Sequence, residues 1–110
     1  MKLLNRKEFI ETFGLDLKKS LLRPAVVDFK APWCGPCRVL HPILKDLEKT
    51  YKGIDFYEVD TDEEQELAFT LNISGIPTLY YFKGEGTFDV TVGLLTRKGL
   101  EDKCDVLLAV

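Results

Sequence analysis

The segment that most limits the possible fold is Ala-Val-Val-Asp-Phe, residues 25–29. It is short, rich in β-branched side chains and apolar on both of its faces, with Asp28 as its only polar residue. Strands of this kind lie in the middle of a sheet that is covered on both sides, because neither face can be left in water. We therefore expect a central strand here, with helices packed on both faces of its sheet.

The rest of the chain alternates between helical and strand patterns. Asn5 and Glu8 have the spacing of a capping box, and Gly14 ends the helix that they begin. Thr96 can cap a last helix. A helix is expected from the two cysteines at 34 and 37 to 52–53, followed by a strand at 54–59 and a short helix opened by Asp62 with Gln65. Strands at 78–82 and 87–92 are expected to be joined by a hairpin at Gly84-Glu85-Gly86. The last helix is expected to bury a stripe of Leu100, Cys104, Leu107 and Leu108. Parallel crossovers followed by an antiparallel hairpin predict an α/β fold with a mixed sheet.

The length and charge of the chain exclude several classes of protein. Its 110 residues suffice for one compact domain, so we expect a single domain over 1–110. A net charge of −3 argues against a nucleic-acid partner. No segment approaches the roughly 18 apolar residues of a membrane span, and the first residues do not resemble a signal peptide. We expect a cytoplasmic monomer without a membrane partner.

Two cysteines separated by Gly-Pro stand between the central strand and the next helix. Cys34 falls near the N-cap, where free backbone N–H groups and the positive end of the helix dipole favour a thiolate. Cys37 lies on the same side of the first turn and can displace a partner bound to Cys34. Gly35 allows close backbone approach, and Pro36 is tolerated in a first turn. We also expect these two residues to tune the pKa of the pair. This pattern favours thiol–disulfide exchange.

The alternative is half of a zinc site, because a structural zinc ion takes four ligands. Only His41 and Cys104 could add to the pair. We expect His41 to be exposed and without a catalytic role, and Cys104 to be a small core residue, with a regulatory thiol as its alternative. The Gly-Pro spacer and the strand–helix context favour redox chemistry with no metal.

Asp28 is the candidate acid beside the thiols. A carboxyl group inside a buried strand is desolvated, which raises its pKa and favours the neutral form. Such a group can take a proton from Cys37, directly or through a water molecule.

Two segments carry a resemblance to a known family. Residues 26–44, VVDFKAPWCGPCRVLHPIL, and residues 73–86, ISGIPTLYYFKGEG, resemble the active-site and cis-proline segments of thioredoxins. The resemblance implies a thioredoxin fold, with a central mixed five-stranded sheet flanked by four helices. It also implies a cytosolic protein-disulfide reductase and electron carrier that binds no cofactor. A thioredoxin reductase using NADPH and FAD would recharge it, and disulfide-containing client proteins would be its substrates.

The resemblance also assigns roles to residues. It makes Cys34 the nucleophile, Cys37 the resolving thiol of a Cys34–Cys37 redox disulfide, and Asp28 the proton acceptor and donor. Glu58 stands where many bacterial members have lysine, so we expect Asp28 to titrate above about 7. The substrate-binding surface is expected to comprise Trp33, Gly75, Ile76, Pro77 after a cis bond, Val92 and Gly93.

Two other functions stay open. A thioredoxin-like chain can be a docking or regulatory subunit with incidental redox activity, although an intact Cys34/Cys37 pair with Asp28 argues against this. A secreted oxidant or isomerase is the other possibility, but such relatives tend to have histidine between their cysteines.

Overall fold

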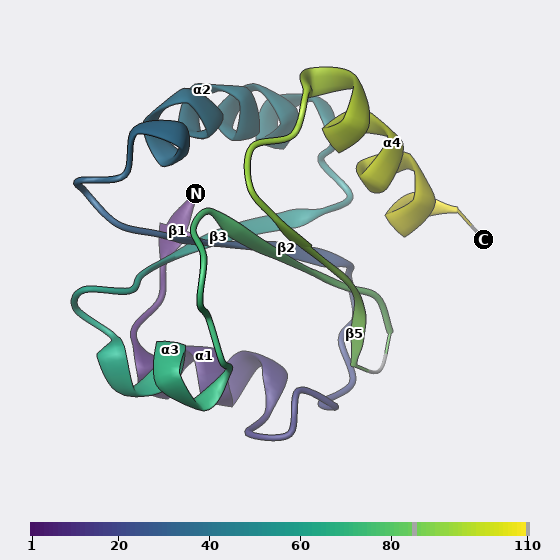
Figure 1. The fold of residues 1–110 in the computed structure, drawn as a ribbon. Coiled ribbons are helices and arrows are strands. Elements are labelled where there is room, and N and C mark those ends of the chain that lie inside the picture. Colours follow the sequence, from purple (N-terminus) through teal and green to yellow (C-terminus); the bar gives the residue numbers. More distant parts are fainter. Residues whose placement is uncertain (85, 110) are drawn as a thin grey trace.

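The computed structural model describes residues 1–84 and 86–109, and Figure 1 shows their arrangement. The elements in chain order are β1 (Lys2–Leu3), α1 (Arg6–Phe13), β2 (Ala25–Lys30), α2 (Gly35–Thr50), β3 (Asp55–Asp60), α3 (Gln65–Thr70), β4 (Thr78–Phe82), β5 (Thr87–Val92) and α4 (Arg97–Leu108). The strands form one mixed sheet in the order β1-β3-β2-β4-β5. Helices α2 and α4 cover one face, and α1 and α3 cover the other. The predicted fold class is confirmed.

Strand β2 lies at the centre of the sheet, as its sequence predicts. It pairs in parallel with β3 and antiparallel with β4, and every residue from Ala25 to Phe29 is buried. In this register Asp28 lies opposite Glu58 on β3 and Leu79 on β4. The central position of the strand therefore buries a carboxyl group within the sheet.

The two faces of the sheet have cores of different composition. The face under α2 and α4 is mostly aliphatic, with Leu40, Leu44, Leu47, Leu79, Leu100, Cys104 and Leu107 among its buried residues. The face under α1 and α3 is richer in aromatic side chains, with Phe9, Phe13, Phe29, Tyr80 and Phe82. The rings of Phe13 and Phe82 stack with centroids 4.1 Å apart. Both cores pack against the central strand and fix its position.

The predicted helix ends are confirmed at three positions. The Asn5 side chain accepts a hydrogen bond of 2.8 Å from the N–H of Glu8, whose carboxylate accepts one of 3.0 Å from the N–H of Asn5. Gly14, with φ of 84°, ends this helix. Thr96 caps α4 by accepting a hydrogen bond of 3.0 Å from the N–H of Gly99.

Two expectations about local structure are corrected, and a third concerns a residue outside the described part of the chain. Asp62 does not open α3, which begins at Gln65 with Glu64 as its N-cap residue. The Asp62 carboxylate instead accepts a hydrogen bond from Trp33. Leu108 is 44% exposed, because it lies at the edge of the α4 stripe, at the last residue of that helix. Glu85 of the predicted hairpin lies outside the described residues. Strand β1 has only two residues and no alternating pattern, so the sequence analysis missed it.

Candidate active site

The first cysteine caps helix α2. The backbone of Cys34 is extended, and its Sγ accepts a hydrogen bond of 3.3 Å from the N–H of Cys37. Pro36 occupies the first turn, where its missing N–H removes no hydrogen bond. In the reduced protein, a sulfur at this position faces free N–H groups and the positive end of the helix dipole, and both stabilise a thiolate.

The two sulfurs of the pair are bonded to each other. The Cα atoms of Cys34 and Cys37 lie 5.3 Å apart, within the usual range for a disulfide. The two residues form a small buried cluster with Ala31, against which Ile76 packs. The Sγ of Cys34 lies 3.8 Å from the carbonyl oxygen of Ile76. A disulfide at this position, between the end of β2 and the loop before β4, can be reduced to a dithiol and formed again.

Two further loops meet beside the disulfide. The peptide bond between Ile76 and Pro77 is cis, and the N–H of Gly93 donates a hydrogen bond of 2.8 Å to the carbonyl of Pro77. Gly93 has φ of 96°, which favours glycine. A Cβ on Gly75 would lie 3.1 Å from a methyl carbon of Val92, so these loops pack closely. The structure thus brings 75–77 and 92–93 together with the cysteines.

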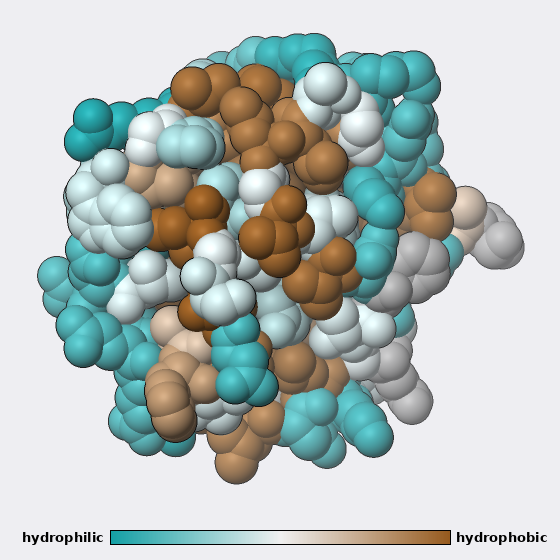
Figure 2. Space-filling view, viewed as in Figure 1, coloured by the Kyte–Doolittle hydropathy of each residue, from teal (hydrophilic) through white to brown (hydrophobic). Residues whose placement is uncertain are grey.

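Exposed apolar side chains surround this site. Trp33 and Val92 are each 66% exposed, and the Trp33 indole N–H donates to the Asp62 carboxylate at 3.0 Å. Val39 and Leu94 are about half exposed. Figure 2 shows several apolar side chains near the middle of the face that it presents, with most of the polar side chains toward its edges. Such a surface suits contact with another polypeptide.

Asp28 is fully buried beneath the site. Neither of its carboxyl oxygens has a hydrogen-bond partner among the described residues. The pKa of Asp28 is raised to about 7, chiefly by burial and secondly by the charge of Glu58, while the nearby Lys30 opposes the shift. The group is therefore poised to gain or lose a proton near neutral pH.

A cavity of about 320 Å³ lies beside Cys37 and contains a charged cluster that the sequence analysis did not assemble. Glu58 is its centre: the Nζ of Lys30 lies 3.8 Å from one carboxylate oxygen, and the Nδ1 of His41 lies 3.5 Å from the other. These residues come from β3, β2 and α2, so no local sequence pattern could have joined them. The resemblance alone drew attention to Glu58.

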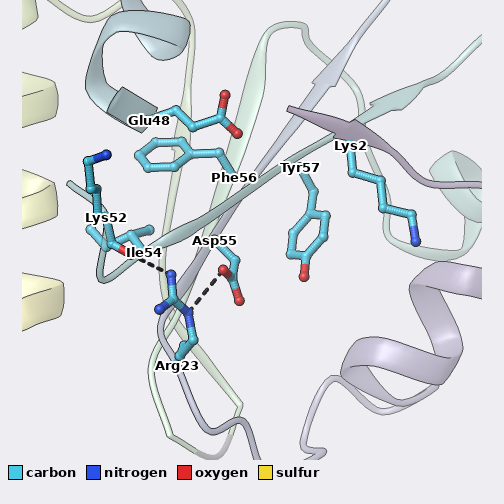
Figure 3. Close-up of a pocket in the computed structure, with 8 residues that line it drawn as sticks. All are labelled: Lys2, Arg23, Glu48, Lys52, Ile54, Asp55, Phe56 and Tyr57. Atoms are coloured by element: carbon cyan, nitrogen blue, oxygen red, sulfur yellow. Dashed lines mark hydrogen bonds and ion pairs between the residues drawn. The ribbon is translucent and has the colours of Figure 1, made fainter. Parts of the chain in front are cut away.

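A second hollow, of about 380 Å³, lies at the opposite end of the sheet, where β2 and β3 begin (Figure 3). Arg23 there donates to the Asp55 carboxylate at 3.0 Å and to the Lys52 carbonyl at 2.6 Å. The Arg23 guanidinium and the Asp55 carboxylate are thus paired, and the described lining contains no thiol. Over 1–84 and 86–109, no group of three or more His, Cys, Asp or Glu side chains is arranged to hold a metal ion.

Comparison with known proteins gives consistent matches. A sequence model described as Thioredoxin matches residues 5–105. Thioredoxin of Borreliella burgdorferi is 43% identical over 81 residues, which cover 73% of this chain and 69% of that protein. Thioredoxin M4 of Arabidopsis thaliana, a chloroplastic protein, is 43% identical over 79 residues, 71% of this chain but only 41% of that protein.

A solved structure agrees over almost the whole chain. Mitochondrial thioredoxin 3 from Saccharomyces cerevisiae, in its oxidized form, superposes with a TM-score of 0.81 at 27% identity, covering 97% of this chain and 95% of that one. With Cys34 and Cys37 at disulfide distance, this chain has the redox-active dithiol of a thiol–disulfide oxidoreductase. The chain belongs to the thioredoxin family.

Proposed function

We propose that this protein reduces disulfide bonds in client proteins, with Cys34 and Cys37 as its reacting groups. The observation that carries the proposal is the disulfide at the N-terminus of α2, where Cys34 is the capping residue. Thioredoxins act on disulfide substrates and are reduced by thioredoxin reductase.

In the first step, the thiolate of Cys34 attacks one sulfur of a client disulfide. A bond forms between the Cys34 Sγ and that sulfur, and the second client sulfur leaves as a thiolate. The free N–H groups at the start of α2 favour the attacking thiolate. Gly35 and Pro36 keep the two cysteines within one turn, and we assign them the tuning of this thiol pKa.

In the second step, Cys37 resolves the mixed disulfide. Its thiol proton passes to Asp28, and the resulting thiolate attacks the Sγ of Cys34. The client's remaining sulfur leaves as a thiolate, and Cys34 and Cys37 become oxidised. Two electrons have then moved to the client. The burial of Asp28, with a pKa of about 7, supports this role.

We assign client binding to the surface around the disulfide. Its residues are Trp33, Gly75, Ile76, Pro77, Val92 and Gly93. The exposure of Trp33 and Val92 supports this assignment. So does the carbonyl of Ile76, 3.8 Å from the sulfur, because a backbone group there can pair with an extended client chain.

The protein is proposed to work as a single-domain monomer over 1–110, in the cytoplasm, as an electron carrier. NADPH and FAD would belong to the partner reductase. The relatives include bacterial and chloroplastic thioredoxins. Among the described residues, no helix is long and apolar enough to span a membrane. A free thiol at Cys104 fits a reducing compartment.

The test is reduction of insulin by NADPH and a thioredoxin reductase, followed by turbidity. Cys34→Ser should retain less than about 1% of wild-type turnover, because it removes the nucleophile. Cys104→Ala, which also removes one thiol, should keep wild-type turnover. Retained turnover in Cys34→Ser would overturn the mechanism. Slow reduction by the wild type, together with a tight stoichiometric partner, would favour the docking-subunit alternative.

A further inference from the structure

The proton that Asp28 takes up has no direct route to solvent. Its carboxyl group is 0% exposed, and its two oxygens have no hydrogen-bond partner in the described part of the chain. A buried acid that must accept one proton per catalytic cycle must also release it. Another group has to connect it to water.

Glu58 is placed to make that connection. It lies opposite Asp28 on the neighbouring parallel strand and close enough for its charge to act on that acid. One of its oxygens, Oε2, is buried without a hydrogen-bond partner among the described residues. Glu58 also lines the cavity beside Cys37, which has room for water molecules.

His41 lies between this oxygen and the solvent. Its Nδ1 is 3.5 Å from Oε2 of Glu58, it lines the same cavity, and its side chain is 41% exposed. Asp28, Glu58 and His41 thus form a line of titratable groups from the core to the surface.

The other cations at this cavity are less suited to move a proton. The Nζ of Lys30 lies 3.8 Å from the other oxygen of Glu58, and the guanidinium of Arg38 donates to the Pro32 carbonyl at 2.7 and 3.0 Å. Histidine is the side-chain type whose charge normally changes between about pH 5 and 8. Lysine and arginine act mainly as fixed charges in this range.

We propose that His41, acting through Glu58, relays protons between Asp28 and solvent. The inference rests on the proposed role of Asp28 and revises the expectation that His41 has no part in catalysis. The proton leaves the Asp28 carboxyl for a Glu58 oxygen, directly or through a water molecule, and then binds Nδ1 of neutral His41. The imidazolium returns to neutral by losing a proton to water. No electrons move in these steps.

The experiment measures insulin reduction in weakly buffered solution across pH 6 to 8.5. His41→Ala and His41→Gln should lower turnover at neutral pH at least about threefold, because they remove the relay. Free imidazole should restore turnover in His41→Ala and leave the wild type unchanged. His41→Lys keeps a cation beside Glu58 but should stay slow. Lys45→Ala, an exposed change one turn further along α2, is the matched control and should behave as wild type.

The outcomes separate the relay from the proposed function. Iodoacetamide should alkylate Cys34 at the wild-type rate in every His41 variant, which shows that the nucleophile is intact. Wild-type turnover of both neutral variants alongside a slow Asp28→Asn would overturn the relay alone. Full rescue by His41→Lys without rescue by imidazole would reduce His41 to a fixed charge. Wild-type turnover of Asp28→Asn would overturn both the relay and the proposed role of Asp28.

Discussion

The N-terminus of α2 and the middle of α4 each hold a buried cysteine, yet their environments differ. Cys34 is 4% exposed and Cys104 is 2% exposed, so solvent exposure does not distinguish them. Cys34 caps its helix and meets free N–H groups, whereas Cys104 lies inside a helix whose N–H groups are already bonded. Burial, followed by the charges of Asp105 and Glu101, raises the pKa of Cys104 to about 12. Since both cysteines are buried, we propose that the capping position of Cys34, where free N–H groups favour a thiolate, makes it the more reactive sulfur.

The strongest test of this comparison is selective alkylation of the reduced, folded protein. At pH 7, iodoacetamide should modify Cys34 at least about 1,000-fold faster than Cys104, because a thiol with so high a pKa has almost no thiolate. Mass spectrometry of the peptides measures the two rates. In denaturing urea the rates should converge, which serves as the control. Similar rates in the folded protein would remove the distinction between the two sites.

Local patterns predicted both of these regions. The spacer, the strand before it and the helical spacing after it placed Cys34 at a helix start, and the same spacing placed Cys104 on a buried stripe. The prediction for Leu108 was wrong because periodicity does not indicate where the packing partner of a helix ends. Strand β1 was missed because two residues carry no period; pairing with β3 defines it.

The cluster around Glu58 lay beyond sequence reasoning for a different reason. Lys30, Glu58 and His41 lie on β2, β3 and α2, and they meet only when the helix packs over the strand pair. Asp28 was predictable because its burial follows from its own strand. Which charges face it depends on tertiary packing, which one sequence does not reveal.

The second prediction compares how stability depends on pH through the acid near each cysteine, Asp28 near Cys34 and Asp105 next to Cys104, in the oxidised protein. Burial raises the pKa of Asp28 from 3.8 to about 7, so the folded state holds this proton more tightly than the unfolded state. The stabilising contribution is complete below about pH 4 and is lost as pH rises through about 7. A pKa shift of about three units corresponds to about 4 kcal/mol in the free energy of unfolding. Asp28→Asn should therefore be more stable than wild type at pH 8, by up to about 4 kcal/mol, with little difference at pH 4.

Urea unfolding at pH 4, 6 and 8 measures this effect. Asp105→Asn is the matched control, because this acid lies beside Cys104 but is exposed. It should leave the slope of stability against pH unchanged. An Asp28→Asn protein with the same slope as wild type would mean that the buried acid titrates normally. The region around Cys34 would then contain no buried acid that destabilises the fold at high pH, and in this respect it would not differ from α4.

The smallest expected effect concerns the packing around Cys104. Cys104 lies in the aliphatic core with Leu100 and Leu107, so Cys104→Ala should leave a small void and cost about 1 kcal/mol. Cys104→Ser should cost about 2 kcal/mol, since it places a hydroxyl among apolar side chains. Both variants should keep wild-type insulin reduction, because α4 contributes none of the residues assigned to the reaction. Cys34→Ser should show the opposite result: in the reduced protein, little change in the urea midpoint and no turnover. If Cys104→Ser instead lost turnover at unchanged stability, α4 would hold a functional thiol. The contrast between a reactive Cys34 and an inert Cys104 would then be wrong.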